Sequence, residues 1–256
     1  MRIDTRYRSS ASLFFPAFPP GVKWLICANV AIYILQLLFV DSTLFGKPIL
    51  LFFNLMPFDV LRHGEIWQLV TYMFLHASIG HILFNMLTLW MFGAAVEQTW
   101  GTRRFLRYYF VCGIGAGVCV VVANLIFGDV YQRTIGASGA IYGVLLAFGM
   151  LFPDQEILLM FLFPIKAKYA VMIFGAIAFL SSLQGGGTVS NLAHLGGMLV
   201  GYAYIKTQFS SRRSRVSASP SFSASAWWHD YKMQRAKKKF QVYMKKQDRD
   251  KGPWVN

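Results

Sequence analysis

Long apolar stretches, separated by short polar connections, run through the chain from residue 24 to residue 208. A helix needs about 20 residues to cross the hydrocarbon core of a bilayer, and six stretches reach or approach that length. They are Trp24–Val40, His81–Gln98, Phe105–Phe127, Ser138–Phe152, Tyr169–Leu183 and Leu192–Gln208. The fourth and fifth are short, and short helices inside a bundle place their ends close to water. The pattern predicts an all-α polytopic membrane protein with six transmembrane helices.

Two connections are longer than a simple turn. Residues 41–80 are rich in Leu, Phe, Met and Trp, which is typical of chain that lies in the membrane interface. We expect Trp67 and Tyr72 at the depth of the lipid headgroups there. In the connection 153–168, Pro164 is expected to stop a helix from continuing.

Basic residues in the connections predict the orientation, because short cytoplasmic loops carry an excess of Lys and Arg. With a cytoplasmic N-terminus, nine basic residues lie inside and three outside. The inner ones are Arg2, Arg6, Arg8, Lys23, Arg103, Arg104, Arg107, Lys166 and Lys168, and the outer ones are Lys47, Arg62 and Arg133. We therefore predict a cytoplasmic N-terminal segment at 1–23, a membrane domain at 24–208 and a cytoplasmic tail at 209–256.

The composition agrees with a membrane protein and gives the tail a separate character. With 55% hydrophobic and 14% charged residues, the chain is too apolar for a soluble domain of 256 residues. The net charge of +14 comes mostly from residues 209–256, which hold 12 Lys and Arg against three Asp and Glu. We expect this tail to meet anionic lipid, either as an amphipathic helix or as a disordered segment. No nucleic-acid-binding motif accompanies the charge, so no nucleic-acid partner is expected.

Few side chains inside the apolar stretches can carry chemistry, and polar groups there are costly enough to suggest a function. His81 and Asn85 lie one helical turn apart and share a face. Ser138 begins the fourth stretch, and His194 lies near the start of the sixth. Alternating topology places these helix ends on the same, outer side. Taken singly, Ser138 is also a favoured helix N-cap, and His81 and Asn85 are suited to interhelical hydrogen bonds.

Taken together, these residues fit acyl transfer. A serine such as Ser138 needs an adjacent base to become a nucleophile, and the imidazole of His194 can accept a proton near neutral pH. The amide of Ser138 at a helix N-terminus, with the side chains of His81 and Asn85, would stabilise an oxyanion. Tyr142, one turn after Ser138, can stack on His194. No carboxylate lies near the pair in the apolar stretches, so we expect a dyad rather than a triad.

Glycines on the same helices would let the two catalytic candidates meet. Gly197 and Gly201 follow His194 at three and seven residues and share its face. We expect this face to pack closely against Gly139 and Gly143 of the fourth stretch, because small residues let membrane helices approach.

Other classes of site lack the residues that they need. None of the five histidines belongs to a His-Glu-x-x-His zinc motif. His76 and His81 could bind a metal, but no third ligand has a fitting spacing. Asp129 and Asp154 flank the apolar stretches, whereas an aspartyl protease of the membrane needs two carboxylates inside them. The cysteines, an odd number without C-x-x-C spacing, are expected to be buried. We expect no metal and no cofactor.

Three motifs, in this order, resemble those of the rhomboid family of intramembrane serine proteases. They are His81-x-x-x-Asn85, Gly136-Ala137-Ser138-Gly139 with Tyr142, and His194-x-x-Gly197-x-x-x-Gly201. The resemblance covers about residues 24–208 and implies a six-helix rhomboid bundle of the basic bacterial form, in the inner membrane. It implies Ser138 as nucleophile, His194 as base, an oxyanion site of His81, Asn85 and the Ser138 amide, and supporting roles for Tyr142, Gly139, Gly197 and Gly201. Structural roles are implied for His76, Gly93, Glu97 and Gly101.

The resemblance also implies a reaction: cleavage of single-pass membrane proteins at small residues, near the outer end of a substrate helix. One departure concerns the anchoring of the outer loop, since Trp67-Gln68 stands where many members carry Trp-Arg. Two other classes stay open. A catalytically inactive relative would bind membrane proteins for quality control but usually lacks the serine or histidine, and a transporter would be expected to show inverted repeats.

Overall fold

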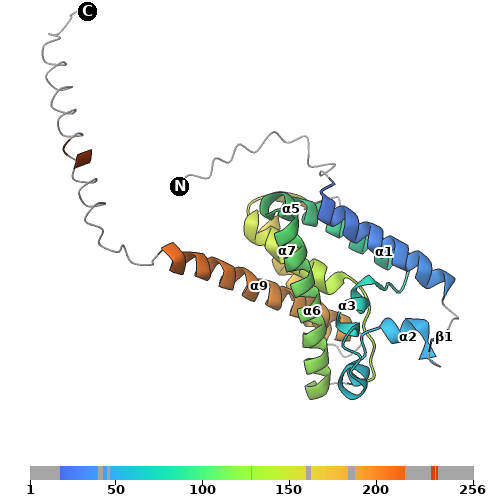
Figure 1. Cartoon of the computed structure of the whole chain (residues 1–256). Helices are drawn as coiled ribbons and strands as arrows, with labels where there is room; N and C mark the ends of the chain where they lie inside the picture. Colours follow the sequence, from blue (N-terminus) through green and yellow to red (C-terminus); the bar gives the residue numbers. More distant parts are fainter. Residues whose placement is uncertain are drawn as a thin grey trace, which may run out of the picture. The chain divides into compact units, whose positions relative to one another are not determined.

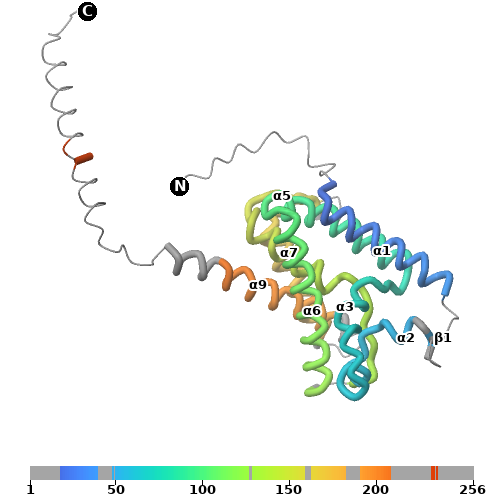
Figure 2. Tube along the Cα trace, viewed as in Figure 1, coloured from blue at the N-terminus to red at the C-terminus, as the bar shows by residue number. Residues whose placement is uncertain are grey.

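The computed structural model of the chain describes residues 18–39, 43–44, 47–127, 129–159, 163–183, 188–216, 232–233 and 235. The chain divides into two units, Met1–Gln208 and Phe209–Asn256. The first unit is mainly helical, and the trace in Figure 2 follows its path. The N-terminal segment up to residue 17, the glycines at 185–187 and nearly all of the basic tail lie outside the described residues, so the predictions made for them stay predictions.

Every predicted apolar stretch is helical in the structure, which confirms the all-α fold class. The helices are α1 (Pro20–Leu38), α4 (Ile79–Thr88) continued by η4 (Leu89–Gly93) and α5 (Ala94–Trp100), α6 (Thr102–Phe127), α7 (Ser138–Leu151), α8 (Ala167–Leu183) and α9 (Thr188–Val216). Among the described residues, three helical segments are long and apolar enough to span a membrane: Pro20–Leu38, Ile79–Trp100 and Thr102–Ile126. Shorter apolar helices lie at Ser138–Leu151 and Ala167–Ser182. Six crossings therefore stay a prediction.

Helix α7 lies at the centre of the first unit. Most of its residues are buried, and α6 packs along it (Figure 1). Its sequence is apolar on all sides, which is the pattern of a helix enclosed by others. The first residue of this enclosed helix is Ser138, so its position is determined by packing on several sides.

A buried carboxylate joins α1 to the second helical segment. Glu97 in α5 accepts hydrogen bonds from the backbone N–H groups of Gly21 and Val22, at 2.8 and 2.7 Å, and from the Thr102 hydroxyl at 2.6 Å. These two N–H groups belong to the first turn of α1, where no intrahelical acceptor exists. The negative charge also suits the positive end of the helix dipole. Glu97 therefore acts as a cap supplied from another helix.

The long outer connection, which we call the outer loop (residues 41–80), is folded rather than extended. It contains β1 (Thr43–Leu44) paired with β2 (Lys47–Pro48), then α2 (Ile49–Phe53), η2 (Asp59–His63), α3 (Gln68–Thr71) and η3 (Tyr72–Phe74). Gln68 anchors it: its carbonyl oxygen accepts from the Met56 N–H at 2.9 Å, and its amide donates to Glu65 at 2.6 Å. The oxygen and the nitrogen of the Gln68 amide thus both have partners within the outer loop.

Two aromatic residues of the outer loop differ in their surroundings. Trp67 is partly exposed, and its indole N–H donates to the carbonyl oxygen of Phe52 at 3.0 Å. Tyr72 is fully buried in the protein, so its ring is not in contact with lipid, and its depth in the membrane stays a prediction. Its hydroxyl donates to the carbonyl oxygen of Gly113 in α6 at 2.7 Å, which satisfies the polar end inside the protein.

The connection before α8 forms a small hairpin that the sequence pattern did not predict. Strand β3 (Glu156–Leu159) pairs antiparallel with β4 (Phe163–Lys166). At its base, the Lys168 ammonium donates to Asp154 at 2.8 Å, and this contact holds the pKa of the Asp154 carboxyl below its usual range. Pro164 lies in a strand, consistent with the expectation that no helix continues through it.

Candidate active site

The segment before Ser138 is held in an extended conformation by the outer loop. Leu55 and Thr134 exchange two backbone hydrogen bonds, of 3.1 and 2.9 Å, and the Gly136 N–H donates to the carbonyl oxygen of Tyr72 at 2.8 Å. Gly136 has a φ of 122°, a conformation that side chains rarely adopt. Ala137 takes the N-cap position of α7, and no side chain caps the helix. The alternative interpretation of Ser138 as an N-cap was therefore wrong.

The structure brings Ser138 and His194 into contact across 56 residues of sequence. The His194 Nε2 lies 2.8 Å from the Ser138 Oγ. Both residues are only partly buried, so part of the surface of the pair is open. If the serine hydroxyl donates to Nε2, the imidazole proton is on Nδ1. The Tyr142 ring lies on the His194 ring with centroids 4.1 Å apart and planes within 2° of parallel, and this stacking restricts rotation of the imidazole.

Glycines set the distance between α7 and α9. A Cβ on Gly197 would collide with the carbonyl oxygen of Gly139, so only glycine fits at that crossing. Gly143 lies at the same contact, where an added Cβ would stand 3.2 Å from the carbonyl oxygen of Gly197. Gly201 differs from the expectation, because it faces α6, with an added Cβ 3.2 Å from the Cys112 sulfur. Gly201 lies about 6 Å further along α9 than Gly197, where the same face of α9 meets α6.

His81 lies beside the same pair from the second helical segment. Ser78 caps α4 by accepting from the His81 N–H at 3.2 Å. The His81 Nδ1 accepts from the Ala77 N–H at 3.4 Å, which leaves the ring proton on Nε2. That nitrogen would be 2.9 Å from a Cβ on Gly136, so it points towards the backbone just before Ser138.

Asn85 is buried one turn beyond His81. Its amide nitrogen has no hydrogen-bond partner among the described residues. A buried amide without an acceptor is costly, so Asn85 is a donor that an oxygen atom could satisfy.

Behind His81 lies a second histidine that the sequence analysis assigned only a structural role. His76 is fully buried, and its ring centroid is 5.1 Å from that of His81. Gln36 in α1 binds the His76 backbone twice: it donates to the carbonyl oxygen at 2.7 Å and accepts from the N–H at 3.1 Å. Burial, and to a smaller extent the neighbouring His81, lowers the pKa of His76 from 6.5 to about 4. Gln36 was missed, although an amide inside an apolar stretch is the kind of signal that could have found it.

A group of possible metal ligands occurs elsewhere, in the outer loop. Donor atoms of Asp59, His63 and Glu65 lie within 4.8 Å of one another, and His63 Nδ1 is 3.1 Å from Asp59 Oδ1. Within the described residues, neither Ser138 nor His194 belongs to such a group. The candidate active site itself presents a hydroxyl, imidazoles and amide donors.

The chain is also similar in sequence to known proteins. Residues 63–211 match the Rhomboid domain family. The chain is 30% identical to Rhomboid protease GluP of Bacillus subtilis over 202 residues, which cover 79% of this chain and 37% of that protein. It is 28% identical to Rhomboid protease GlpG of Salmonella paratyphi A over 76% of this chain and 66% of that protein. It is 27% identical to Rhomboid protease AarA of Providencia stuartii over 69% of this chain and 68% of that protein. The chain thus spans little more than a third of the length of the Bacillus relative.

Proposed function

Because the chain belongs to the rhomboid family, we propose that it is an intramembrane serine endopeptidase, which hydrolyses peptide bonds in or near transmembrane segments of membrane proteins. The observation that supports this activity most directly is the 2.8 Å contact between Ser138 Oγ and His194 Nε2. Nucleophile and base within hydrogen-bond reach are the minimum requirement for serine catalysis.

In this proposal, Ser138 attacks the carbonyl carbon of the substrate while His194 takes the hydroxyl proton. The protonated imidazole then gives that proton to the leaving amine, and an acyl-enzyme remains on Ser138. Water enters from the open surface of the pair, His194 accepts its proton, and hydrolysis of the ester restores Ser138. In each step, His194 either accepts a proton or donates one at the position that Ser138 Oγ contacts.

Oxyanion stabilisation falls to donors that are already present around Ser138. The Ser138 N–H is at the first position of α7, where no intrahelical acceptor exists. His81 Nε2 and the buried amide of Asn85 would supply two more donors. Losing one such donor typically lowers kcat by about 100- to 1000-fold.

Tyr142 takes the place that a carboxylate has in a triad. Its ring restricts the His194 imidazole by stacking, and Gly139 and Gly197 permit the approach of α7 and α9 that makes the contact possible. The dyad therefore depends on helix packing for the orientation that an Asp would provide elsewhere.

The proposed substrates are single-pass transmembrane proteins. A peptide bond inside a helix is shielded, so a substrate segment must unwind before its carbonyl can reach Ser138, and small residues favour that unwinding. We place the protein in a bacterial inner membrane with both termini in the cytoplasm, on the distribution of Lys and Arg. The basic tail would then lie against anionic lipid.

A fluorophosphonate probe tests the proposal, because it labels a serine only when that serine is activated. The purified full chain in detergent should be labelled, and both Ser138→Ala and His194→Ala should abolish labelling. Ser182→Ala is the matched control. The Ser182 hydroxyl donates to the carbonyl oxygen of Phe179 at 2.6 Å and has no histidine partner among the described residues, so this variant should be labelled like the native protein. Labelling that persists in Ser138→Ala would rule out this serine as the nucleophile.

A further inference from the structure

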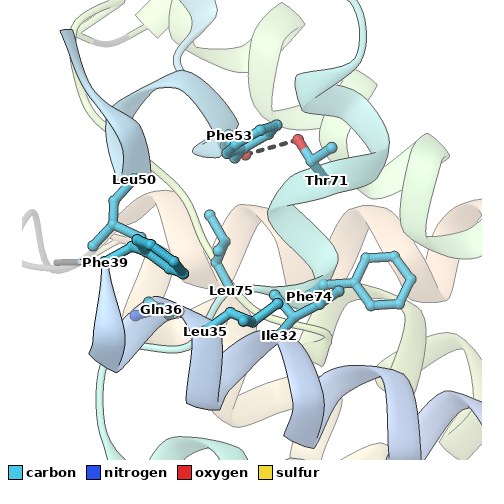
Figure 3. Close-up of a pocket in the computed structure, with 9 residues that line it drawn as sticks. All are labelled: Ile32, Leu35, Gln36, Phe39, Leu50, Phe53, Thr71, Phe74 and Leu75. Atoms are coloured by element: carbon cyan, nitrogen blue, oxygen red, sulfur yellow. Dashed lines mark hydrogen bonds between the residues drawn. The ribbon is translucent and has the colours of Figure 1, made fainter. Parts of the chain in front are cut away.

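An apolar pocket lies between α1 and the outer loop, and its lining does not include Ser138, His194, His81 or Asn85. Its volume is about 410 Å³. Figure 3 shows side chains of α1 along one side and those of α2 and α3 on the other. The apolar residues that line it include Ile32, Leu35, Phe39, Leu50, Phe53 and Leu75.

The two polar side chains in the lining are already used by the protein. The Thr71 hydroxyl donates to the carbonyl oxygen of Phe53 at 2.8 Å, the bond drawn in Figure 3. The Gln36 amide is engaged on both its oxygen and its nitrogen by the backbone of His76. The exposed wall of the pocket is almost entirely apolar, so the pocket suits a saturated hydrocarbon.

The mouth of the pocket is continuous with the surface that α1 presents to the membrane. Leu35 and Phe39 line the pocket and are also exposed, as are the neighbouring Ile34, Leu37 and Leu38. α1 is one of the segments long and apolar enough to span a bilayer. With α1 in a bilayer, the exposed apolar side chains at this mouth would face lipid.

We propose that the pocket holds one acyl chain of a phospholipid from the surrounding leaflet. An alkyl chain has no polar group that this apolar wall would leave unpaired, and it makes only the dispersion contacts that the wall offers.

The driving force is packing rather than water exclusion. A lipid chain is as apolar as the pocket wall, so moving it from the bilayer into the pocket releases almost no hydrophobic free energy. An unfilled space would, however, cost the wall atoms their dispersion contacts. In this proposal a lipid chain fills the pocket because lipid surrounds the face of α1 at which the pocket opens.

The acyl chain would support the part of the outer loop that leads to the candidate active site. Thr71 and Leu75 form the wall opposite α1, and His76 follows directly, bound to Gln36 and in ring contact with His81. The lipid is thereby a structural component of the loop. This inference does not depend on the proposed peptidase activity.

Photocrosslinking tests it in the full chain reconstituted in liposomes. The probe is a phosphatidylethanolamine with a diazirine within its acyl chain, and labelled peptides are identified by mass spectrometry. Native protein should carry label on the inner wall, in α2 and at Thr71–Leu75. Leu35→Trp, which fills the mouth, should lose that label. Leu37→Trp is the matched control, because Leu37 is similarly exposed (59% against 51%) but does not line the pocket.

Two outcomes would overturn the proposal. One is inner-wall labelling that is equal in native protein and Leu35→Trp. The other is displacement of the label by an excess of a transmembrane peptide, which would make the pocket a site for substrate. Thermal unfolding of each variant establishes that it is folded, and Phe39→Trp repeats the test from a second mouth residue if Leu35→Trp does not fold. A failure here would leave the Ser138 labelling result unaffected.

Discussion

Gly136 is a residue whose backbone conformation and neighbours both restrict its side chain. With a φ of 122°, any L side chain is strained, and a Cβ would lie 2.8 Å from His81 Cε1. We expect Gly136→Ala to lower the free energy of unfolding by about 1–2 kcal/mol from the backbone alone. Displacement of His81 should also slow fluorophosphonate labelling by about 10-fold or more.

Gly64→Ala is the control for Gly136→Ala. Gly64 also has a positive φ, of 69°, but an added Cβ meets nothing within 4 Å. It should therefore show the loss of stability without the loss of labelling, measured by thermal unfolding and labelling kinetics side by side. Equal labelling rates in the two variants would contradict the placement of His81 against Gly136.

His76 predicts a pH dependence of stability. Its pKa is lowered by burial to about 4 in the folded protein, while the unfolded chain binds a proton near pH 6.5. Between these values the unfolded state binds more protons, so the free energy of unfolding falls as the pH drops from about 6.5 to about 4. Above pH 6.5, His76 is neutral in both the folded and the unfolded state, so it no longer lowers the free energy of unfolding.

His76→Leu should remove the part of this pH dependence that comes from His76. Thermal unfolding in detergent at a series of pH values should show a shallower decline towards acid than the native protein shows. Identical slopes for the two proteins would mean that another group is responsible.

At the scale of elements, the contact between α7 and α9 is the most sensitive to side-chain volume. Gly197→Ala would place a methyl group on the carbonyl oxygen of Gly139 and push the helices apart. We expect a loss of about 1–3 kcal/mol of stability and of most fluorophosphonate labelling, because the Ser138–His194 contact lengthens.

Gly175→Ala in α8 provides the comparison. Its added Cβ would make an ordinary contact with Met198 at 3.4 Å, and alanine has the better helix propensity. Stability should stay the same or rise, and labelling should not change. A similar loss in both variants would show that helices here tolerate no added methyl group, rather than that Gly197 is special.

The elements themselves were largely readable from the sequence. All six apolar stretches became helices, because a long apolar run in lipid must satisfy its own backbone hydrogen bonds. The hairpin of β3 and β4 was not predicted. Each strand has only four residues, and the two pair only because the chain reverses direction between them. The small elements of the outer loop were missed for the same reason.

At the scale of the whole molecule, the prediction to check is the orientation in the membrane. Tyr131 and Lys166 are both exposed and belong to connections that the charge distribution places on opposite sides. In a background with the three native cysteines replaced by alanine, Tyr131→Cys should react with a membrane-impermeant maleimide in intact cells. Lys166→Cys should react only after the inner membrane is opened. The reverse pattern would contradict the proposed topology.

The sequence by itself determined which stretches are apolar, which polar side chains lie among them, and the family to which they belong. These are properties of neighbouring residues, so they can be read along the chain. Only the tertiary structure decided that His194 lies 2.8 Å from Ser138, that Tyr72 is inside the protein and that Gln36 binds the backbone of His76. Each of these depends on how closely separate helices approach, and that distance follows from volumes on both partners at once, as with Gly197 against Gly139.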